Sequence, residues 1–377
     1  VGNLGGVNSA ASRLVIEKGA ELRTTPAVTQ GSAMSVQTAD GGVINNSGDY
    51  IVNRAISGTK LTKKGSGWMK LNVANTSLDR LVVAGGTVQC VSCNTPARTV
   101  EFQGGTLTEN TSTSYGIYIP SGKSGRWNLV DRGSYGNKIT GEGTLTIYCP
   151  VVVGSGWNAT RTQIQGNWSE FKGTIKPAVH SSDTRFTLDN ANGLPLGTLD
   201  IANGIEVQNS GRSFTIGKLS GTGSLGGVCS FSNSGGASGS NVWKVGNEES
   251  WRWGGSVVGN GTQFVKIGSG KVVVSGVWTN TGAVTIQEGE LNVTSTASLG
   301  TGTLTVAKDA ILSGVTTSSN TLKNSAYTIN GTLQVGVTTS SYSGIMNFGS
   351  KNVSFSTGST LVANVLRAPN NNTTGGI

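Results

Sequence analysis

The acidic residues are the first candidates for chemistry, because hydrolysis of a glycosidic bond uses two carboxylates and related lyases gather acids around calcium. The 377-residue chain has 19 Asp and Glu residues, and they are dispersed. The only adjacent pair is Glu248-Glu249, while Glu288, Glu290 and Asp309 could approach one another in the fold. No further basic or acidic residue is identifiable that could act together with these three acids. We therefore expect a solvated edge here and assign no catalytic residue.

The remaining motifs give no support for a nucleophile or a phosphate site. The chain has a single histidine, His180, and no Gly-x-Ser-x-Gly elbow at a strand-to-helix turn. The Gly-Ser-Gly stretches at 65–67 and 268–270 precede predicted strands, so they have no helix N-terminus to hold an anion. We expect no cofactor.

The cysteines allow two interpretations. Cys90, Cys93, Cys149 and Cys229 are either buried reduced thiols, or Cys90 and Cys93 form a disulfide in an oxidising compartment. A zinc site is not expected, because Cys90-Val-Ser-Cys93 has no second ligand pair and His180 lies far away in sequence. The sequence thus predicts no metal site.

The eight tryptophans are the best candidates for ligand contact, since an exposed aromatic ring can stack on a sugar. Trp251 and Trp253 alternate in Ser250-Trp-Arg-Trp-Gly254, which places both rings on one face of a strand and Arg252 on the other. These three residues are the candidate glycan-binding site; the alternative is that both rings cover the core. Trp68, Trp168 and Trp278 are interpreted as loop or coil-packing residues of the repeat.

The composition indicates a thin, repetitive core. The chain has 58 glycines, about twice the usual share, and 12% charged residues, about half the usual fraction. Short Val, Ile and Leu runs within a 35% apolar composition argue against disorder. The formal charge is +9, but the cations are scattered and no nucleic-acid-binding motif accompanies them, so we expect no nucleic-acid partner. No apolar run is long enough to span a membrane, and Val1 does not begin a signal peptide.

Internal repetition determines the predicted fold. A short strand, a Gly or Asx corner and a second short strand recur along the chain, with corners at positions 86, 105, 289, 309, 331 and 358. Glycine, and next Asn or Asp, tolerates the backbone of such corners. We therefore predict an all-β fold, a right-handed single-stranded parallel β-helix of roughly 17 coils, with under about a tenth helix.

Two stretches align at a constant offset of 203: Leu61-Thr-Lys-Lys-Gly-Ser-Gly-Trp-Met-Lys-Leu71 and Phe264-Val-Lys-Ile-Gly-Ser-Gly-Lys-Val-Val-Val274. Each leads to a strand, a corner and a strand, and the second is followed by the loop Trp278-Thr-Asn-Thr-Gly282. This pattern resembles the autotransporter-associated β-strand repeat of bacterial surface and passenger proteins. Repeat-like stretches lie near 58–107, 140–176 and 214–312.

The resemblance implies a bacterial β-helix, secreted or exported to the cell surface, that serves as an adhesin or a structural stalk. Glycans or other cell-surface molecules would be its partners. The alternative is a carbohydrate-active β-helix, similar to a polysaccharide lyase, a glycoside hydrolase or a tailspike, whose carboxylates converge only in the fold. We expect 1–377 to form one elongated unit, because no linker divides it, and the natural chain to continue beyond Ile377.

Overall fold

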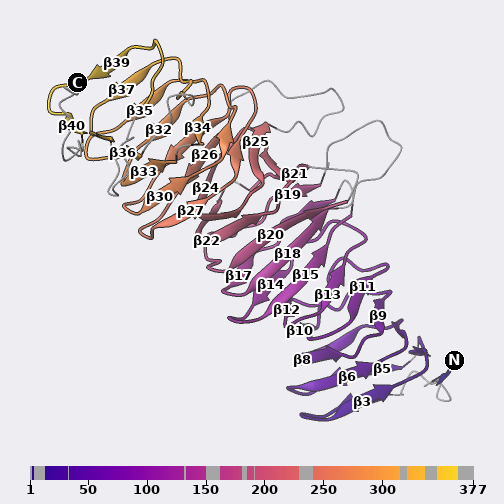
Figure 1. Cartoon of the computed structure of the whole chain (residues 1–377). Helices are drawn as coiled ribbons and strands as arrows, with labels where there is room; N and C mark the ends of the chain where they lie inside the picture. Colours follow the sequence, from indigo (N-terminus) through magenta and orange to yellow (C-terminus); the bar gives the residue numbers. More distant parts are fainter. Residues whose placement is uncertain are drawn as a thin grey trace, which may run out of the picture. The chain divides into compact units, whose positions relative to one another are not determined.

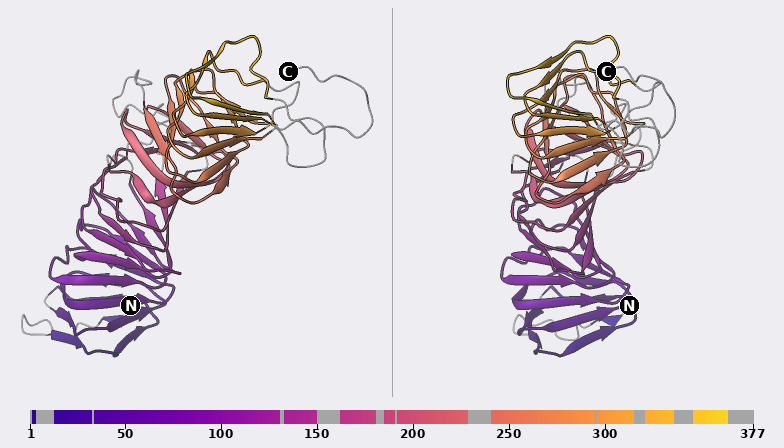
Figure 2. Two further views of the ribbon diagram at one scale, coloured as in Figure 1. Left: turned by 90° about the vertical axis from the view of Figure 1, so that its left-hand side faces the viewer. Right: turned by 60° about the vertical axis from the view of Figure 1, so that its left-hand side comes forward.

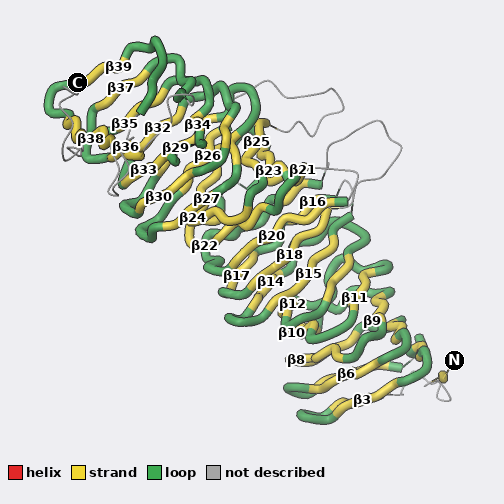
Figure 3. Tube along the Cα trace, viewed as in Figure 1, coloured by secondary structure: helices red, strands yellow, loops and turns green. Residues whose placement is uncertain are grey.

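The computed structural model consists of β-strands stacked in parallel. It describes residues 2–3, 13–32, 34–130, 133–149, 162–180, 185–190, 192–228, 241–294, 296–314, 321–335 and 346–363. In these ranges every regular element is a strand, and each described strand pairing is parallel (Figures 1 and 3). The predicted all-β parallel β-solenoid is confirmed, with about 14 coils against the roughly 17 expected. The segment after Ala363, on which the expected continuation depended, lies outside the described residues.

The chain forms two compact units. The first comprises Val1–Gly217 with Cys229–Ala237, and the second comprises Lys218–Val228 with Ser238–Ile377. The boundary falls inside strand β24 (Ser213–Gly221), so no linker precedes the second unit. The sequence predicted one unit, because neither a composition change nor a charge block marks this position.

In the first unit the strands of successive coils stack into two long sheets and several short ones (Figure 2). The first long sheet contains β1 (Gly2–Asn3), β4 (Val28–Thr29), β7 (Tyr50–Val52), β9 (Trp68–Leu71), β11 (Thr87–Cys90), β13 (Thr106–Thr108), β15 (Ser124–Asn128), β18 (Thr144–Cys149), β20 (Thr174–Val179) and β22 (Leu194–Ile201). The second contains β2 (Arg13–Ile16), β3 (Glu21–Thr24), β5 (Ser35–Thr38), β6 (Gly42–Asn46), β8 (Ile56–Lys64), β10 (Leu78–Val83), β12 (Thr99–Phe102), β14 (Gly116–Ile119) and β17 (Ile139–Gly141). Short strands pair as β16 (Ser134–Tyr135) with β19 (Gln163–Ile164), and as β21 (Arg185–Leu188) with β23 (Glu206–Asn209).

The second unit repeats this arrangement. One sheet contains β26 (Val242–Val245), β29 (Gln263–Lys266), β32 (Val284–Ile286), β35 (Leu304–Val306), β37 (Tyr327–Ile329) and β39 (Val353–Phe355). Another contains β27 (Trp251–Trp253), β30 (Lys271–Val274), β33 (Glu290–Val293), β36 (Ile311–Gly314), β38 (Thr332–Val335) and β40 (Thr360–Ala363). Short strands pair as β25 (Ser224–Val228) with β28 (Ser256–Val257), and as β31 (Val277–Trp278) with β34 (Ser298–Leu299).

The core follows from the two-residue period of each strand. In β18 the inward side chains are Leu145, Ile147 and Cys149, all fully buried, while the residues between them stay partly exposed. Leu145 pairs in register with Ile175 of the next coil, so apolar side chains stack along the solenoid. Each buried Leu or Ile contributes about 1.5–3 kcal/mol, and it does so only against the neighbouring coils.

The corners explain why glycine recurs at the offset of 203. Gly86 and Gly289 have φ values of +62° and +66°. A Cβ atom at Gly289 would lie 2.5 Å from the carbonyl oxygen of Gly268 in the preceding coil, so both the backbone and the close approach demand glycine. Among the described non-glycine residues, Asp309 alone has positive φ, at +66°, which fits its predicted corner.

The remaining predicted corners agree only in part. Gly358 has the expected positive φ, of +86°. At the second predicted corner the positive φ lies at Gly104, one residue before position 105. Gly331 is not among the positive-φ glycines, but a Cβ atom there would meet the Ala307 oxygen at 2.2 Å, so close packing is what requires glycine.

A buried lysine closes the corner in each of the two aligned stretches. Lys63 and Lys266 are fully buried. The Lys266 Nζ donates to the carbonyl oxygens of Ile267 at 2.9 Å, Gly268 at 2.6 Å and Glu288 at 3.0 Å. Lys63 makes the equivalent three bonds at 2.7–3.2 Å. Each ammonium group thus joins the carbonyls of its own corner to a carbonyl of the next coil.

Candidate functional site

The predicted glycan-binding tryptophans lie inside the second unit. Both rings are on one face of β27, as expected, but that face is inward: Trp251 is 6% exposed and Trp253 is 1% exposed. The Trp253 ring centroid lies 6.1 Å from that of Trp278, which in turn lies 4.6 Å from that of Phe264. These rings form an aromatic core and offer no open face to a sugar, whereas Arg252 is exposed. The alternative, that the two rings cover the core, fits the structure. Trp251 and Trp253 are therefore not available for stacking on a sugar.

The three tryptophans interpreted as loop or coil-packing residues differ in their exposure. Trp168 and Trp278 are 1% and 2% exposed, so their interpretation as packing residues is confirmed. Trp68 is 41% exposed and directly follows the bend at 65–67, so of the two interpretations coil packing does not apply to it. Trp68 opens β9 on the outward phase of the strand, while Met69 and Leu71 point inward. The alternation Trp-Met-Lys-Leu carried this signal in the sequence.

The three acids that the sequence singled out in the second unit do not form a catalytic cluster. Glu290 pairs with Lys271 at 2.7 Å and accepts a hydrogen bond from the Ser313 hydroxyl. Glu288 is exposed and contributes its backbone oxygen to Lys266, and Asp309 occupies its exposed corner. Glu290 is therefore engaged by a cation and a hydroxyl group of the neighbouring coils.

The described ion pairs follow one pattern throughout the chain. Of 11 pairs, ten join residues 19 to 32 positions apart, which is the spacing of successive coils. The exception is Arg23 with Glu21 on one strand. Pairs at an exposed surface contribute at most about 1 kcal/mol each, so their main effect is to match neighbouring coils.

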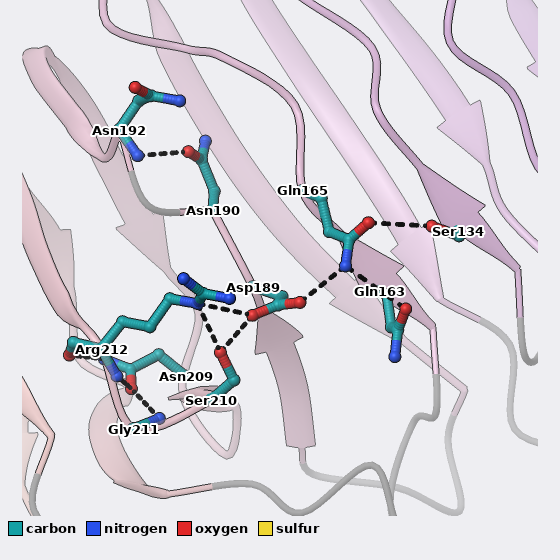
Figure 4. A network of polar contacts seen from close by, with 10 residues as sticks. All are labelled: Ser134, Gln163, Gln165, Asp189, Asn190, Asn192, Asn209, Ser210, Gly211 and Arg212. Atoms are coloured by element: carbon teal, nitrogen blue, oxygen red, sulfur yellow. Dashed lines mark hydrogen bonds and ion pairs between the residues drawn. The ribbon is translucent and has the colours of Figure 1, made fainter.

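The most extended polar network lies on the short strands of the first unit (Figure 4). Asp189 is 8% exposed and accepts hydrogen bonds from Gln165 Nε2 at 2.8 Å, Arg212 Nε at 3.0 Å and the Ser210 hydroxyl. Gln165 in turn accepts from the Ser134 hydroxyl at 3.0 Å, which extends the network across four coils. Burial raises the pKa of Asp189, but the three hydrogen bonds and the Arg212 charge outweigh it and hold the pKa below 3.8. The carboxylate is thus ionised at neutral pH and bonded within the chain.

A second group of titratable residues lies inside the first unit. Glu109 is 2% exposed and accepts hydrogen bonds from the Tyr115 hydroxyl and, at 3.0 Å, from Trp127 Nε1. Burial raises the pKa of Glu109 to about 7, while hydrogen bonds from Tyr115, Trp127 and Cys90 limit the rise. A pKa near 7 suits acid–base catalysis, but this carboxyl group lies in the packed interior, where a substrate does not reach it. A surface hollow of about 290 Å³ lies elsewhere and is lined by Arg23, Thr24, Thr25, Asn45 and Ser47.

The described cysteines are thiols, not disulfides. Cys90, Cys93 and Cys149 are buried, and no disulfide joins Cys90 to Cys93 in this structure. The hydrogen bond between their thiols, followed by burial, raises the pKa of Cys90 well above its usual range, so it is unreactive as a nucleophile. Cys229 lies outside the described residues. In the described ranges no group of three metal-ligating side chains could hold an ion.

The fold and these side-chain networks define a parallel β-solenoid with polar contacts between its coils. Comparison with known proteins adds no family: no family model, no curated protein and no solved structure matches the chain. Across the described ranges no helix has the length and apolar character needed to cross a membrane.

Proposed function

We propose that this chain is a non-enzymatic β-solenoid of a bacterial surface or secreted protein, which acts as an adhesin or a structural stalk. The resemblance of its Lys-x-Gly-x-Gly stretches to the autotransporter-associated repeat supports this assignment, and so does the parallel solenoid itself. An extracellular location and cell-surface molecules as partners belong to the same proposal.

The observation that carries the proposal is that acidic side chains bond to residues of neighbouring coils. Asp189 holds an Arg, a Gln and a Ser from neighbouring coils, and Glu290 holds Lys271 and Ser313. An enzyme of this fold would instead gather two or three acids around a basic group in one groove. The acids here contribute to coil-to-coil contact, which is what a long, regular scaffold requires.

The test measures adhesion and catalysis on the same purified protein. We expect it to bind to bacterial or host cells in a saturable manner, while a panel of plant, bacterial and host polysaccharides incubated with it gains no new reducing ends and no unsaturated products. Heat-unfolded protein is the control for non-specific adhesion. Release of oligosaccharides by the folded protein would refute the scaffold assignment and support the carbohydrate-active alternative.

A further inference from the structure

The outward side of the first long sheet carries a regular array of polar side chains between β9 and β18. Its first column runs in register through Trp68, Thr87, Thr106, Arg126 and Thr146. Its second column, two residues further along each strand, runs through Lys70, Gln89, Thr108, Asn128 and Tyr148. We call these two columns the threonine face. No residue is inserted or skipped in either column, so the face spans four strand spacings, about 19 Å.

The threonine face is accessible. Trp68 is 41% exposed, and the nine other side chains are each partly exposed. Each of these side chains thus keeps part of its surface open to solvent within the part of the chain that the structure describes. The Trp68 indole is therefore an open aromatic surface at one end of a strip of hydroxyl and amide groups.

The face is also nearly neutral. None of its ten side chains is acidic, and Lys70 is paired with Asp49 at 2.6 Å. Arg126 lies over the Tyr148 ring at 4.6 Å and donates from Nε to Asn128 Oδ1 at 2.8 Å, so its guanidinium contacts two other members of the face. Asn128 donates in turn to the Thr108 hydroxyl at 3.1 Å.

This chemistry selects among possible partners. A nucleic acid needs a row of cations, and among the described residues this face has one cation, Arg126, for which no acidic partner is seen. A protein partner needs a desolvated apolar centre, and apart from Trp68 the face has none. A polymer of sugars fits both features, because its hydroxyl groups match the threonines and amides, and the C–H face of a pyranose ring matches an indole.

We propose that the threonine face binds a linear, uncharged glycan that lies along the columns, with one ring stacked on Trp68 and the chain extending toward Tyr148. A β-1,4-linked pyranose chain suits the site, because its rings form a flat ribbon with equatorial hydroxyls along both edges. The proposal rests on the adhesin function and names the ligand class and the surface for it.

The test titrates chitohexaose and cellohexaose into the purified protein by calorimetry, with binding expected for at least one of them. Trp68→Ala is expected to weaken that binding about tenfold or more, since it removes the stacking surface. Thr106→Val with Thr108→Val keeps the side-chain shape but removes two hydroxyls, and is expected to weaken binding about threefold to tenfold. The matched control is Thr285→Val with Thr305→Val, which makes the same change on outward residues of the second unit and should leave binding unchanged.

Three outcomes would overturn the inference: no binding of either oligosaccharide, equal binding by the Trp68 and control variants, or binding that is abolished when sodium chloride is raised about tenfold, which would mean that electrostatic contacts and not stacking and hydroxyl contacts sustain it. Thermal unfolding of each variant separates loss of the site from loss of the fold. The same variants are tested for cell adhesion. If they adhere normally, the adhesin function stands and the threonine face is not its site; if wild-type protein releases shorter sugars, the proposed function itself fails.

Discussion

Replacement of the buried corner lysine by methionine tests the account of the solenoid corners most directly. In Lys266→Met, the carbonyl oxygens of Ile267, Gly268 and Glu288 lose their common donor, which bonds them at 2.6–3.0 Å. Each bond to a charged donor contributes about 1.5 kcal/mol at the lower end of its range, and part of that gain offsets the cost of burying the ammonium. We expect the free energy of unfolding to fall by about 3 kcal/mol at pH 7.

The pH dependence makes this prediction specific. Burial lowers the pKa of Lys266 from 10.5 to about 8, with Glu288 and Glu290 opposing the shift. Between these two values the unfolded chain binds a proton that the folded chain has released, so wild-type stability gains with rising pH relative to the variant. The difference between the two proteins should be constant below pH 8 and should widen by up to about 3 kcal/mol by pH 10.5.

Urea unfolding at 25 °C, followed by tryptophan fluorescence at pH 7, 9 and 10.5, measures this difference. Titrations of tyrosines and cysteines are common to both proteins and cancel. Lys271→Met is the matched control, because Lys271 lies in the same unit but makes a partly exposed ion pair, for which we expect a loss of at most about 1 kcal/mol. A difference that narrows above pH 8 would refute the reasoning, since it would mean that the carbonyl cage raises the lysine pKa.

Three further substitutions test the corners and the polar network around Asp189, each by the same urea unfolding. Gly289→Ala should cost at least about 2 kcal/mol, because the new Cβ would lie 2.5 Å from the Gly268 oxygen at a φ of +66°; a loss under about 0.5 kcal/mol would show that the corner relaxes freely. At the exposed corner, Asp309→Ala should lower the free energy of unfolding by about 1 kcal/mol, whereas Asp309→Gly should not lower it. Equal effects of the two substitutions would argue against the positive φ at this residue. Asp189→Asn should cost about 1–2 kcal/mol at pH 7, since three donors lose a charged acceptor. Because the Asp189 pKa is lowered in the folded state, its contribution is present above pH 3.8 and is lost as the pH falls further, so the Asn variant should approach wild type in acid.

Much of the fold was predictable because it depends on local chemistry that repeats. The two-residue period of apolar residues gave the inward face of each strand, and the tolerance for positive φ marked Gly86, Gly289 and Asp309 as corners. The predicted count of roughly 17 coils is close to the observed 14 or so, and the difference arises because the steps are unequal. Thr87, Thr106, Arg126 and Thr146 follow at 19 or 20 residues, but the next paired residue, Lys176, comes 30 residues later.

The candidate site was predicted less well, and the reason lies in which side of a strand faces water. Trp251 and Trp253 share a face as their spacing required, but with Arg252 between them the apolar face is the inward one. The burial of Lys63 and Lys266 was not predicted, since lysine is seldom buried. Both nevertheless occupy the apolar phase of their strands, two residues after Leu61 and Phe264, and this phase was visible in the sequence. The polar network around Asp189 was not predictable, since its residues come from coils joined by segments of unequal length.

The two phases of each strand have separate tasks in this architecture. Inward residues such as Leu107 and Trp127 pair with equivalents in the next coil and carry the stability, because each coil packs only against its neighbours. Outward residues on the same strands, such as Thr106 and Arg126, form the surface, so a substitution there alters the surface without altering the inward packing. A scaffold of this kind can acquire a ligand-binding face by substitution at every second residue, and the coil-to-coil register then sets the spacing of the binding groups. A ligand that repeats along its length, such as a linear glycan, is the kind of partner that a surface repeating at each coil is suited to bind.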